Sequence, residues 1–155
     1  MCIRDRDLGC RIYTFITTLR YVLEAAAAHQ KTVWILDRPN PAGRPVEGLM
    51  LRPGWESFVG AGPMPMRHGL TMGELANWFI NTLALDVDCQ VIRMQGWQPE
   101  SAPGYGWPLG ERSWINPSPN APNLWMTRCY AGTVMLEGTT PVSYTHLTLP
   151  TIYSV

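Results

Sequence analysis

Lysine is almost absent from this chain. Of the 12 basic residues only Lys31 is a lysine, and the others are arginines. The 12 basic side chains are matched by 12 acidic ones, so the formal net charge is zero. A balanced chain of this kind offers no general electrostatic attraction for nucleic acid or for an anionic membrane. We therefore expect no nucleic-acid partner.

Several motif classes are missing as well. The four cysteines form no CxxC pair and no zinc-ligand spacing, and paired histidine ligands are absent. No GxGxxG or GxxxxGK[ST] pattern supports a nucleotide cofactor, and no GxSxG pattern supports a serine hydrolase. No apolar run approaches the length of a membrane span, and no signal peptide opens the chain. We expect no metal, no cofactor and no membrane insertion.

What the chain does have is apolar and aromatic content. Its 155 residues are 46% hydrophobic and include seven tryptophans, which suits one domain with a real core and argues against disorder. The two ends, residues 1–6 and 141–155, resemble translated sequencing-adapter ends and are set aside. We expect residues 7–140 to be an internal piece of a longer protein, in which case the missing signal peptide carries no information.

Hydrophobic spacing predicts an alternation of helices and strands. Three- and four-residue spacing favours a helix over residues 13–29, and a β-branched run favours a buried strand over 32–36. A second helix is expected over 72–85, opened by a Thr71–Glu74 capping box, and a second strand over 89–94. Residues 121–131 favour a short helix. Trp34 and Trp78 are expected in the core.

The order helix, strand, long loop, helix, strand predicts an α/β fold. It is typical of part of a Rossmann-like, doubly wound and mostly parallel sheet, incomplete at both ends. Residues 37–70 form a Gly- and Pro-rich connection that is too long for an ordinary loop, and such loops are often functional. It opens with Asp37-Arg38-Pro39-Asn40-Pro41, at the strand edge where open α/β sheets bind ligands.

Eight short blocks, taken in order, resemble the DUF1343 family, whose characterised members are exo-β-N-acetylmuramidases of the NamZ type. The blocks are GCRIYTF (9–15), LDRPNP (36–41), VEG (46–48), SFVG (57–60), RHGLTMGELA (67–76), MQGW (94–97), WINPSPN (114–120) and LEGT (136–139). The resemblance covers residues 7–140. It implies a Rossmann-like N-terminal domain, a smaller C-terminal domain and a cleft between them. The family's "PEHG" block is absent from this chain.

The resemblance also implies an activity. The longer protein would remove terminal, non-reducing N-acetylmuramic acid from peptidoglycan fragments, in the periplasm or outside the cell, and this piece alone would be inactive. A non-catalytic wall-sugar-binding module of the same fold is the main alternative, and a small-molecule transferase is a third. The oligomeric state stays open.

Three residues are the catalytic candidates, because glycosidic hydrolysis needs a carboxylic acid and usually a second carboxylate. Asp37 stands at a strand end, where it could act in catalysis or merely cap a turn. Glu137 follows an apolar run, where burial would suit an acid and a turn carboxylate is the plain alternative. His68 could tune a carboxylate or bond a sugar hydroxyl, or it could simply bond backbone.

Five residues are the substrate-binding candidates. Arg11 and Arg38 could hold the lactyl carboxylate of a muramyl sugar, since Arg forms a bidentate fork with carboxylates, or Arg38 could pair with Asp37. Asn40 and Asn120 stand beside prolines and could bond sugar hydroxyls, although Asn is also an ordinary turn residue. Glu47 lies in the long loop, where it could bind substrate or be solvated.

Overall fold

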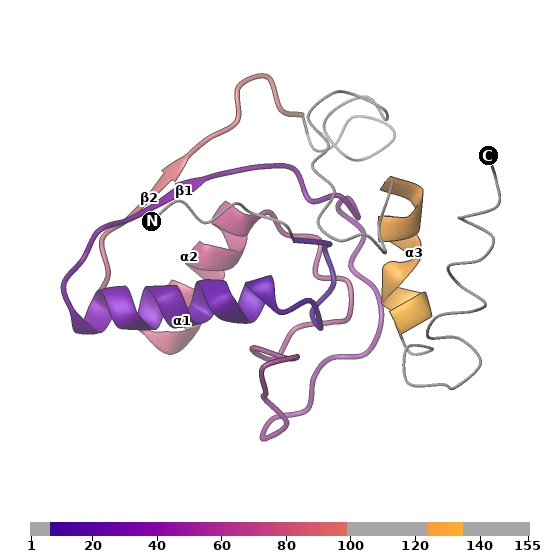
Figure 1. Cartoon of the computed structure of the whole chain (residues 1–155), viewed down its shortest axis with the longest axis horizontal. Coiled ribbons are helices and arrows are strands. Elements are labelled where there is room, and N and C mark those ends of the chain that lie inside the picture. The colour runs from indigo at the N-terminus through magenta and orange to yellow at the C-terminus, as the bar shows by residue number, and fades with distance from the viewer. Residues whose placement is uncertain (1–6, 99–123, 135–155) are drawn as a thin grey trace, which may run out of the picture.

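The computed structural model describes residues 7–98 and 124–134, and these form a small α/β unit (Figure 1). Three helices and two strands make it up, and none of these helices is long and apolar enough to cross a membrane. In chain order the elements are α1 (Phe15–Ala28), β1 (Val33–Leu36), α2 (Met72–Leu83), β2 (Cys89–Ile92) and α3 (Leu124–Thr133). The predicted order of these elements is confirmed, and the ends of each element differ from the prediction by at most three residues.

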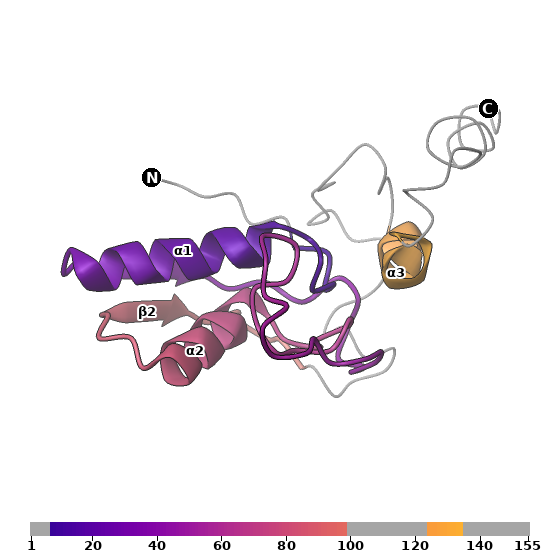
Figure 2. The same ribbon diagram turned by 90° about the horizontal axis from the view of Figure 1, so that it is seen from below.

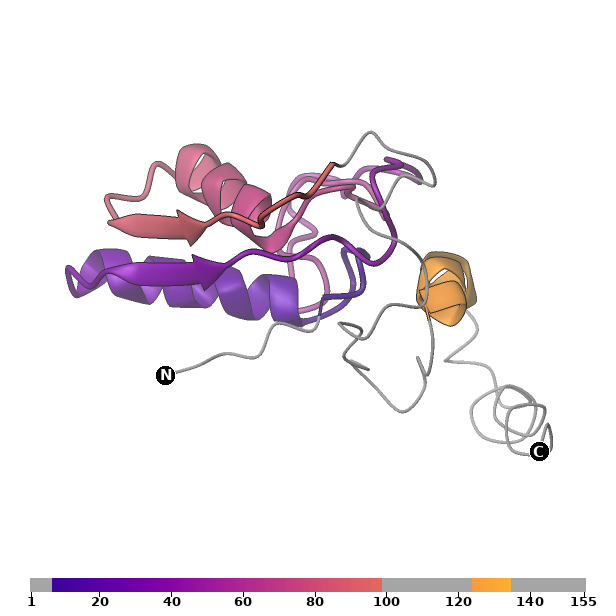
Figure 3. The same cartoon turned by 90° about the horizontal axis from the view of Figure 1, so that it is seen from above.

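The two strands pair in parallel, as predicted. Val33 lies opposite Cys89 and Leu36 opposite Ile92, and the Asp37 N–H extends the ladder by donating to the Ile92 carbonyl at 3.1 Å. Both strands end on the side where the long connection gathers (Figure 3). This carboxyl end of the sheet is therefore where residues 37–71 and the starts of α1 and α2 meet.

Both α1 and α2 pack on one face of the sheet (Figures 2 and 3). The stripes that the spacing predicted meet each other there, so the core is an α1–α2 contact resting on the strands. Its buried members are Ile16, Leu19, Leu23, Ile35, Ala61, Met64, Met72, Leu75, Ala76 and Phe79. Two helices and one sheet face thus form a single apolar cluster.

The start of α2 follows the predicted capping box. The Glu74 N–H donates to the Thr71 hydroxyl at 3.2 Å, and the Thr71 N–H donates to the Glu74 carboxylate at 2.9 Å. Arg44 adds an ion pair to the same carboxylate at 2.6 Å. Glu74 is therefore a structural residue, as its spacing from Thr71 predicted. The helix ends at Leu83, and the residue that follows it, Ala84, has a left-handed backbone with φ 49°.

The opposite face of the sheet is open within the described residues. Trp34, Leu36 and Ile92 point to it and are 67%, 61% and 43% exposed. The prediction that Trp34 lies in the core is wrong. Successive side chains of a strand alternate between the two faces of the sheet, so Ile35 faces the helices and its neighbour Trp34 faces the opposite side. Trp78 is half-buried on the rim of α2.

Candidate functional site

Polar side chains gather at the carboxyl end of the sheet from three separate segments. They come from residues 7–11 before α1, from residues 37–47 after β1, and from residues 67–74 at the start of α2. Arg67 ties these segments together, because its backbone forms antiparallel bridges with both Cys10 and Glu47. We call this group the strand-end cluster.

Asp37 is the anchor between β1 and α2. Its Oδ1 accepts from the Arg38 and Gly73 N–H groups at 3.0 and 2.9 Å, and its Oδ2 accepts from the Thr71 hydroxyl at 2.9 Å. Both oxygens are thus occupied by donors at a helix N-terminus, where a carboxylate is favourable. This geometry favours the capping alternative over a catalytic one. The partner from Arg38 is its backbone N–H, not its guanidinium.

Asn40 is buried and has a structural task. Its amide nitrogen donates to the Leu70 carbonyl at 3.0 Å, and its amide oxygen accepts from the Ala42 N–H at 2.8 Å. Gly9 lies against it with φ +72°, and a Cβ there would come within 2.1 Å of the Asn40 oxygen. Of the two alternatives for Asn40, sugar binding and a turn residue, the structure favours the turn residue, because both the nitrogen and the oxygen of its amide are already bonded within the protein.

His68 forms the most deeply buried polar contact of the cluster. Its Nδ1 accepts from the Leu70 N–H at 3.1 Å, which places the proton of the neutral ring on Nε2. That nitrogen lies 3.4 Å from Oδ2 of Asp7. The two side chains are 1% and 5% exposed. A carboxylate facing a ring N–H fixes the tautomer and the orientation of the imidazole.

Asp7 is the residue that sequence reasoning missed. It stands only two positions before the Gly9 block, at the boundary between the expected foreign end and the native region. Its partner His68 is 61 positions away, so no local pattern reveals the pair. The signal that the sequence did offer was an acidic residue two positions before Gly9.

The side chains of Arg11 and Glu47 both bond to other parts of the chain. One Arg11 nitrogen donates to the carbonyls of Leu49 and Met64, at 2.9 and 2.6 Å, which fastens the long loop to the start of the chain. Glu47 forms an ion pair with Arg67, which also donates to the Ala42 carbonyl at 2.5 Å. Substrate contacts of Arg11 and Glu47 stay predictions.

Arg38 differs from Arg11, Arg44 and Arg67, whose guanidinium groups all bond within the protein. The Arg38 side chain is exposed, and no hydrogen bond or ion pair of its guanidinium occurs within residues 7–98 and 124–134. Within the described part of the chain it is an unpaired positive charge at the carboxyl end of β1. Arg93, directly after β2, is exposed like Arg38, and its guanidinium likewise has no hydrogen bond or ion pair among the described residues. Glu137 and Asn120 lie outside the described residues, so their predicted roles stay predictions.

Helix α3 approaches the same edge. The ring of Tyr130 meets that of Tyr13 edge-on, with centroids 6.0 Å apart. Burial, and then the positive charge of Arg67, lower the pKa of Arg128. Cys10 is buried among these charges, and desolvation raises the pKa of its thiol to about 11. Since a thiolate is the nucleophile, Cys10 is unsuited to attack at neutral pH.

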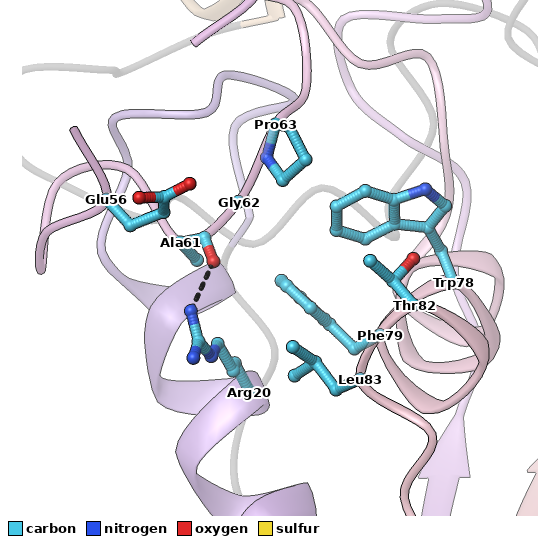
Figure 4. Close-up of a pocket in the computed structure, with 9 residues that line it drawn as sticks. All are labelled: Arg20, Glu56, Ala61, Gly62, Pro63, Trp78, Phe79, Thr82 and Leu83. Carbon is cyan, nitrogen blue, oxygen red and sulfur yellow. Dashed lines mark hydrogen bonds between the residues drawn. The ribbon is translucent and has the colours of Figure 1, made fainter. Parts of the chain in front are cut away.

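The described part of the chain contains no group of three or more His, Cys, Asp or Glu side chains that could hold a metal ion. It does contain a pocket of about 310 Å³ between α1, α2 and residues 56–63 (Figure 4). None of the predicted site residues lines that pocket.

A family model decides the chain's affiliation. Residues 1–125 match the model described as exo-beta-N-acetylmuramidase NamZ, N-terminal. The chain belongs to this family. The NamZ family is one of glycoside hydrolases, and the resemblance read from the eight sequence blocks is thereby confirmed. The bounds of the two foreign ends stay predictions.

Individual relatives agree with the family model. The chain is 38% identical over 135 residues to the peptidoglycan beta-N-acetylmuramidase NamZ of Bacillus subtilis (strain 168), covering 86% of this chain and 32% of that protein. Two crystal structures of DUF1343 family proteins from Bacteroides fragilis NCTC 9343 share its fold. Their TM-scores are 0.73 and 0.74, with identities of 34% and 33%.

These matches span only part of each relative. The solved structures are aligned over 84% and 86% of this chain but over 34% and 36% of their own chains. The chain thus corresponds to about a third of the proteins that it matches. Its partial, Rossmann-like α/β fold agrees with the corresponding part of the two solved structures.

Proposed function

We propose that the whole protein containing this chain is an exo-β-N-acetylmuramidase. It hydrolyses the terminal, non-reducing N-acetylmuramic acid from peptidoglycan fragments, in the periplasm or outside the cell. The observation that carries this proposal is the 38% identity to the Bacillus subtilis NamZ over 86% of the chain. The chain itself, which corresponds to about a third of that protein, supplies one wall of the site and is inactive alone.

The strand-end cluster supports a division of labour within this wall. The polar atoms of Asp37 and Asn40 form hydrogen bonds to the start of α2 and to the long loop, so these two residues hold the backbone of the wall in place. The buried Asp7–His68 pair holds the segments before α1 and α2 together. Among the described residues, Arg38 and Arg93 present unpaired charges to solvent at the carboxyl end of the sheet. We assign to Arg38 the lactyl carboxylate of the muramyl sugar, and to Glu137 the role of the general acid.

Assays of the whole protein test the reaction. A chromogenic β-N-acetylmuraminide should release its chromophore with the whole protein and should remain intact with the 155-residue chain. Glu137→Gln in the whole protein should lower kcat at least a hundredfold while leaving sugar binding, because the acid is lost and the shape is kept. Retained binding of muramyl sugars by the wild-type protein without any release would instead favour the non-catalytic binding module.

The role of Arg38 can be separated from the reaction itself. The β-N-acetylglucosaminide lacks the lactyl carboxylate, so Arg38→Ala should raise KM for the muraminide about tenfold and leave the glucosaminide unaffected. Lys31→Ala, which removes a solvent-exposed charge before β1, is the matched control and should change neither substrate. An equal loss on both substrates would remove Arg38 from lactyl recognition without disproving hydrolysis.

A further inference from the structure

A second concave site lies on the helical side of the sheet, where the function above uses no residue. The pocket of about 310 Å³ is formed by α1, α2 and the end of the long loop. Figure 4 shows Arg20 and Glu56 on one side and the ring of Trp78 on the other, with Phe79 and Leu83 between them. Its volume is at the lower end of the range for small-molecule sites, so it suits a small ligand.

Aromatic side chains give this pocket its apolar wall. Trp78 and Phe79 meet at 66° with ring centroids 5.0 Å apart. The indole of Trp78 lies so close to Gly62 that a Cβ there would come within 2.9 Å of it. Glycine at that position therefore lets the indole rest on the loop. The six-membered edge of the indole, at Cη2 and Cζ3, is the part that meets the loop, so Trp78 adds apolar surface to the pocket.

The charges that line the pocket do not cancel. Arg20 is committed to the protein, because its Nε donates to Glu24 at 2.7 Å and one terminal nitrogen donates to the Ala61 carbonyl at 2.7 Å. Glu56 is exposed, and no hydrogen bond or ion pair of its carboxylate occurs among the described residues. With Arg20 and Glu24 paired, Glu56 leaves one uncompensated negative charge at the mouth.

We propose that this pocket binds a small organic cation that carries an apolar stem. The ammonium lies against the Glu56 carboxylate, and the stem rests on the apolar wall of Trp78, Phe79 and Leu83. An anion is disfavoured, because the carboxylates of Glu24 and Glu56 outnumber the single guanidinium of Arg20 at this pocket. The proposal is independent of the muramidase function, since it uses none of the strand-end cluster.

Titration of the 155-residue chain with two matched probes tests the charge requirement. The probes are 2-phenylethylammonium and 2-phenylethanol, which have the same ring and stem and differ in the charged group. The indole N–H signal of Trp78, identified with Trp78→Phe, reports occupancy in a ¹H–¹⁵N spectrum. At about 0.15 M salt the ammonium should bind about threefold more tightly than the alcohol, from its attraction to one exposed carboxylate.

Variants locate the effect. Glu56→Gln should reduce the ammonium's affinity to that of the alcohol, whereas Asp86→Asn, which removes another exposed carboxylate, should leave it unchanged. Thr82→Trp places bulk at an exposed lining position of α2, so it should block both probes without disturbing the core. Equal binding of the two probes, an unaltered preference in Glu56→Gln, or no shift of the Trp78 signal with either probe overturns the proposal.

Discussion

The two faces of the β1–β2 sheet are built from the same two strands but have different surroundings. On the helical face Ile35 is buried, and Val33, Cys89 and Val91 pack against the core. On the other face Trp34 and Leu36 are largely exposed. Both faces are apolar in sequence, so hydrophobicity did not decide which would be covered. The packing of α1 and α2 decided it. The difference between the two faces predicts which substitutions will change the free energy of unfolding.

The largest effect is expected on the covered face. Phe79 is 1% exposed and packs between the two helices and the sheet. Phe79→Ala should lower the free energy of unfolding by about 3–5 kcal/mol, through lost transfer energy and the cavity left behind. Urea unfolding followed by circular dichroism measures this. Phe58→Ala, which truncates a half-exposed ring, is the control and should cost less than about 1 kcal/mol.

A pH dependence should come from the buried thiol of Cys10, which lies in the strand-end cluster rather than on either face of the sheet. Burial raises the pKa of Cys10 from 9.0 to about 11, so folding favours the protonated form. The resulting stability is complete below pH 9 and is lost as the pH rises towards and through 11, in total roughly 2–3 kcal/mol.

Cys10→Ala isolates this contribution, because it removes the titrating group. The unfolding free energy of the wild-type chain should fall more steeply between pH 9 and 11 than that of Cys10→Ala. Parallel curves for the two proteins would contradict the burial of a neutral thiol.

A smaller loss is expected where α2 touches the sheet most closely. A Cβ on Gly73 would come within 2.6 Å of Val91 Cγ1 and 3.0 Å of Asp37 Cγ. Gly73→Ala should therefore destabilise the fold by about 1–3 kcal/mol, through overpacking. Gly132→Ala in α3 meets nothing within 4 Å and should be neutral or slightly stabilising. Thermal melting of the pair should show shifts of opposite sign or of clearly different size.

The smallest effect is expected on the open face. Trp34→Thr keeps a residue that suits a strand and removes only exposed apolar surface, so stability should change by less than about 0.5 kcal/mol. Solubility of the 155-residue chain should rise, because an exposed apolar patch is reduced. Static light scattering checks the second point. A loss above about 2 kcal/mol would mean that something covers this face in solution.

Local patterns predicted the elements of the fold well. The α1 and α2 helices, the two strands and the Thr71–Glu74 cap depend on residues close in sequence, and all of them are confirmed. The parallel pairing of the strands is also confirmed, and it was predicted from the order of the elements. The family resemblance was also visible in short blocks. By contrast, the exposure of Trp34 could not be predicted, because the face of the strand that is covered depends on where α1 and α2 pack in the tertiary fold.

The candidate site was predicted less completely than the fold. The sequence placed Asp37 at the correct strand end, but its bonds to Thr71 and Gly73 lie 34 and 36 positions away and change its meaning. The Asp7–His68 contact likewise joins residues far apart in the sequence, so it could not be predicted from local patterns. A residue's chemical type is local information, whereas its hydrogen-bond partners are set by the tertiary fold.

The parallel register has a consequence for synthesis. Val33 pairs with Cys89, which is 56 positions later in the chain. At about 5–20 residues per second, a ribosome takes roughly 3–11 s to make that stretch. Throughout this time the apolar stripe of α1 and strand β1 have neither α2 nor β2 to cover them. Synonymous codons that slow translation across residues 37–88 would lengthen the exposure, so the yield of folded protein depends on how quickly this stretch is translated.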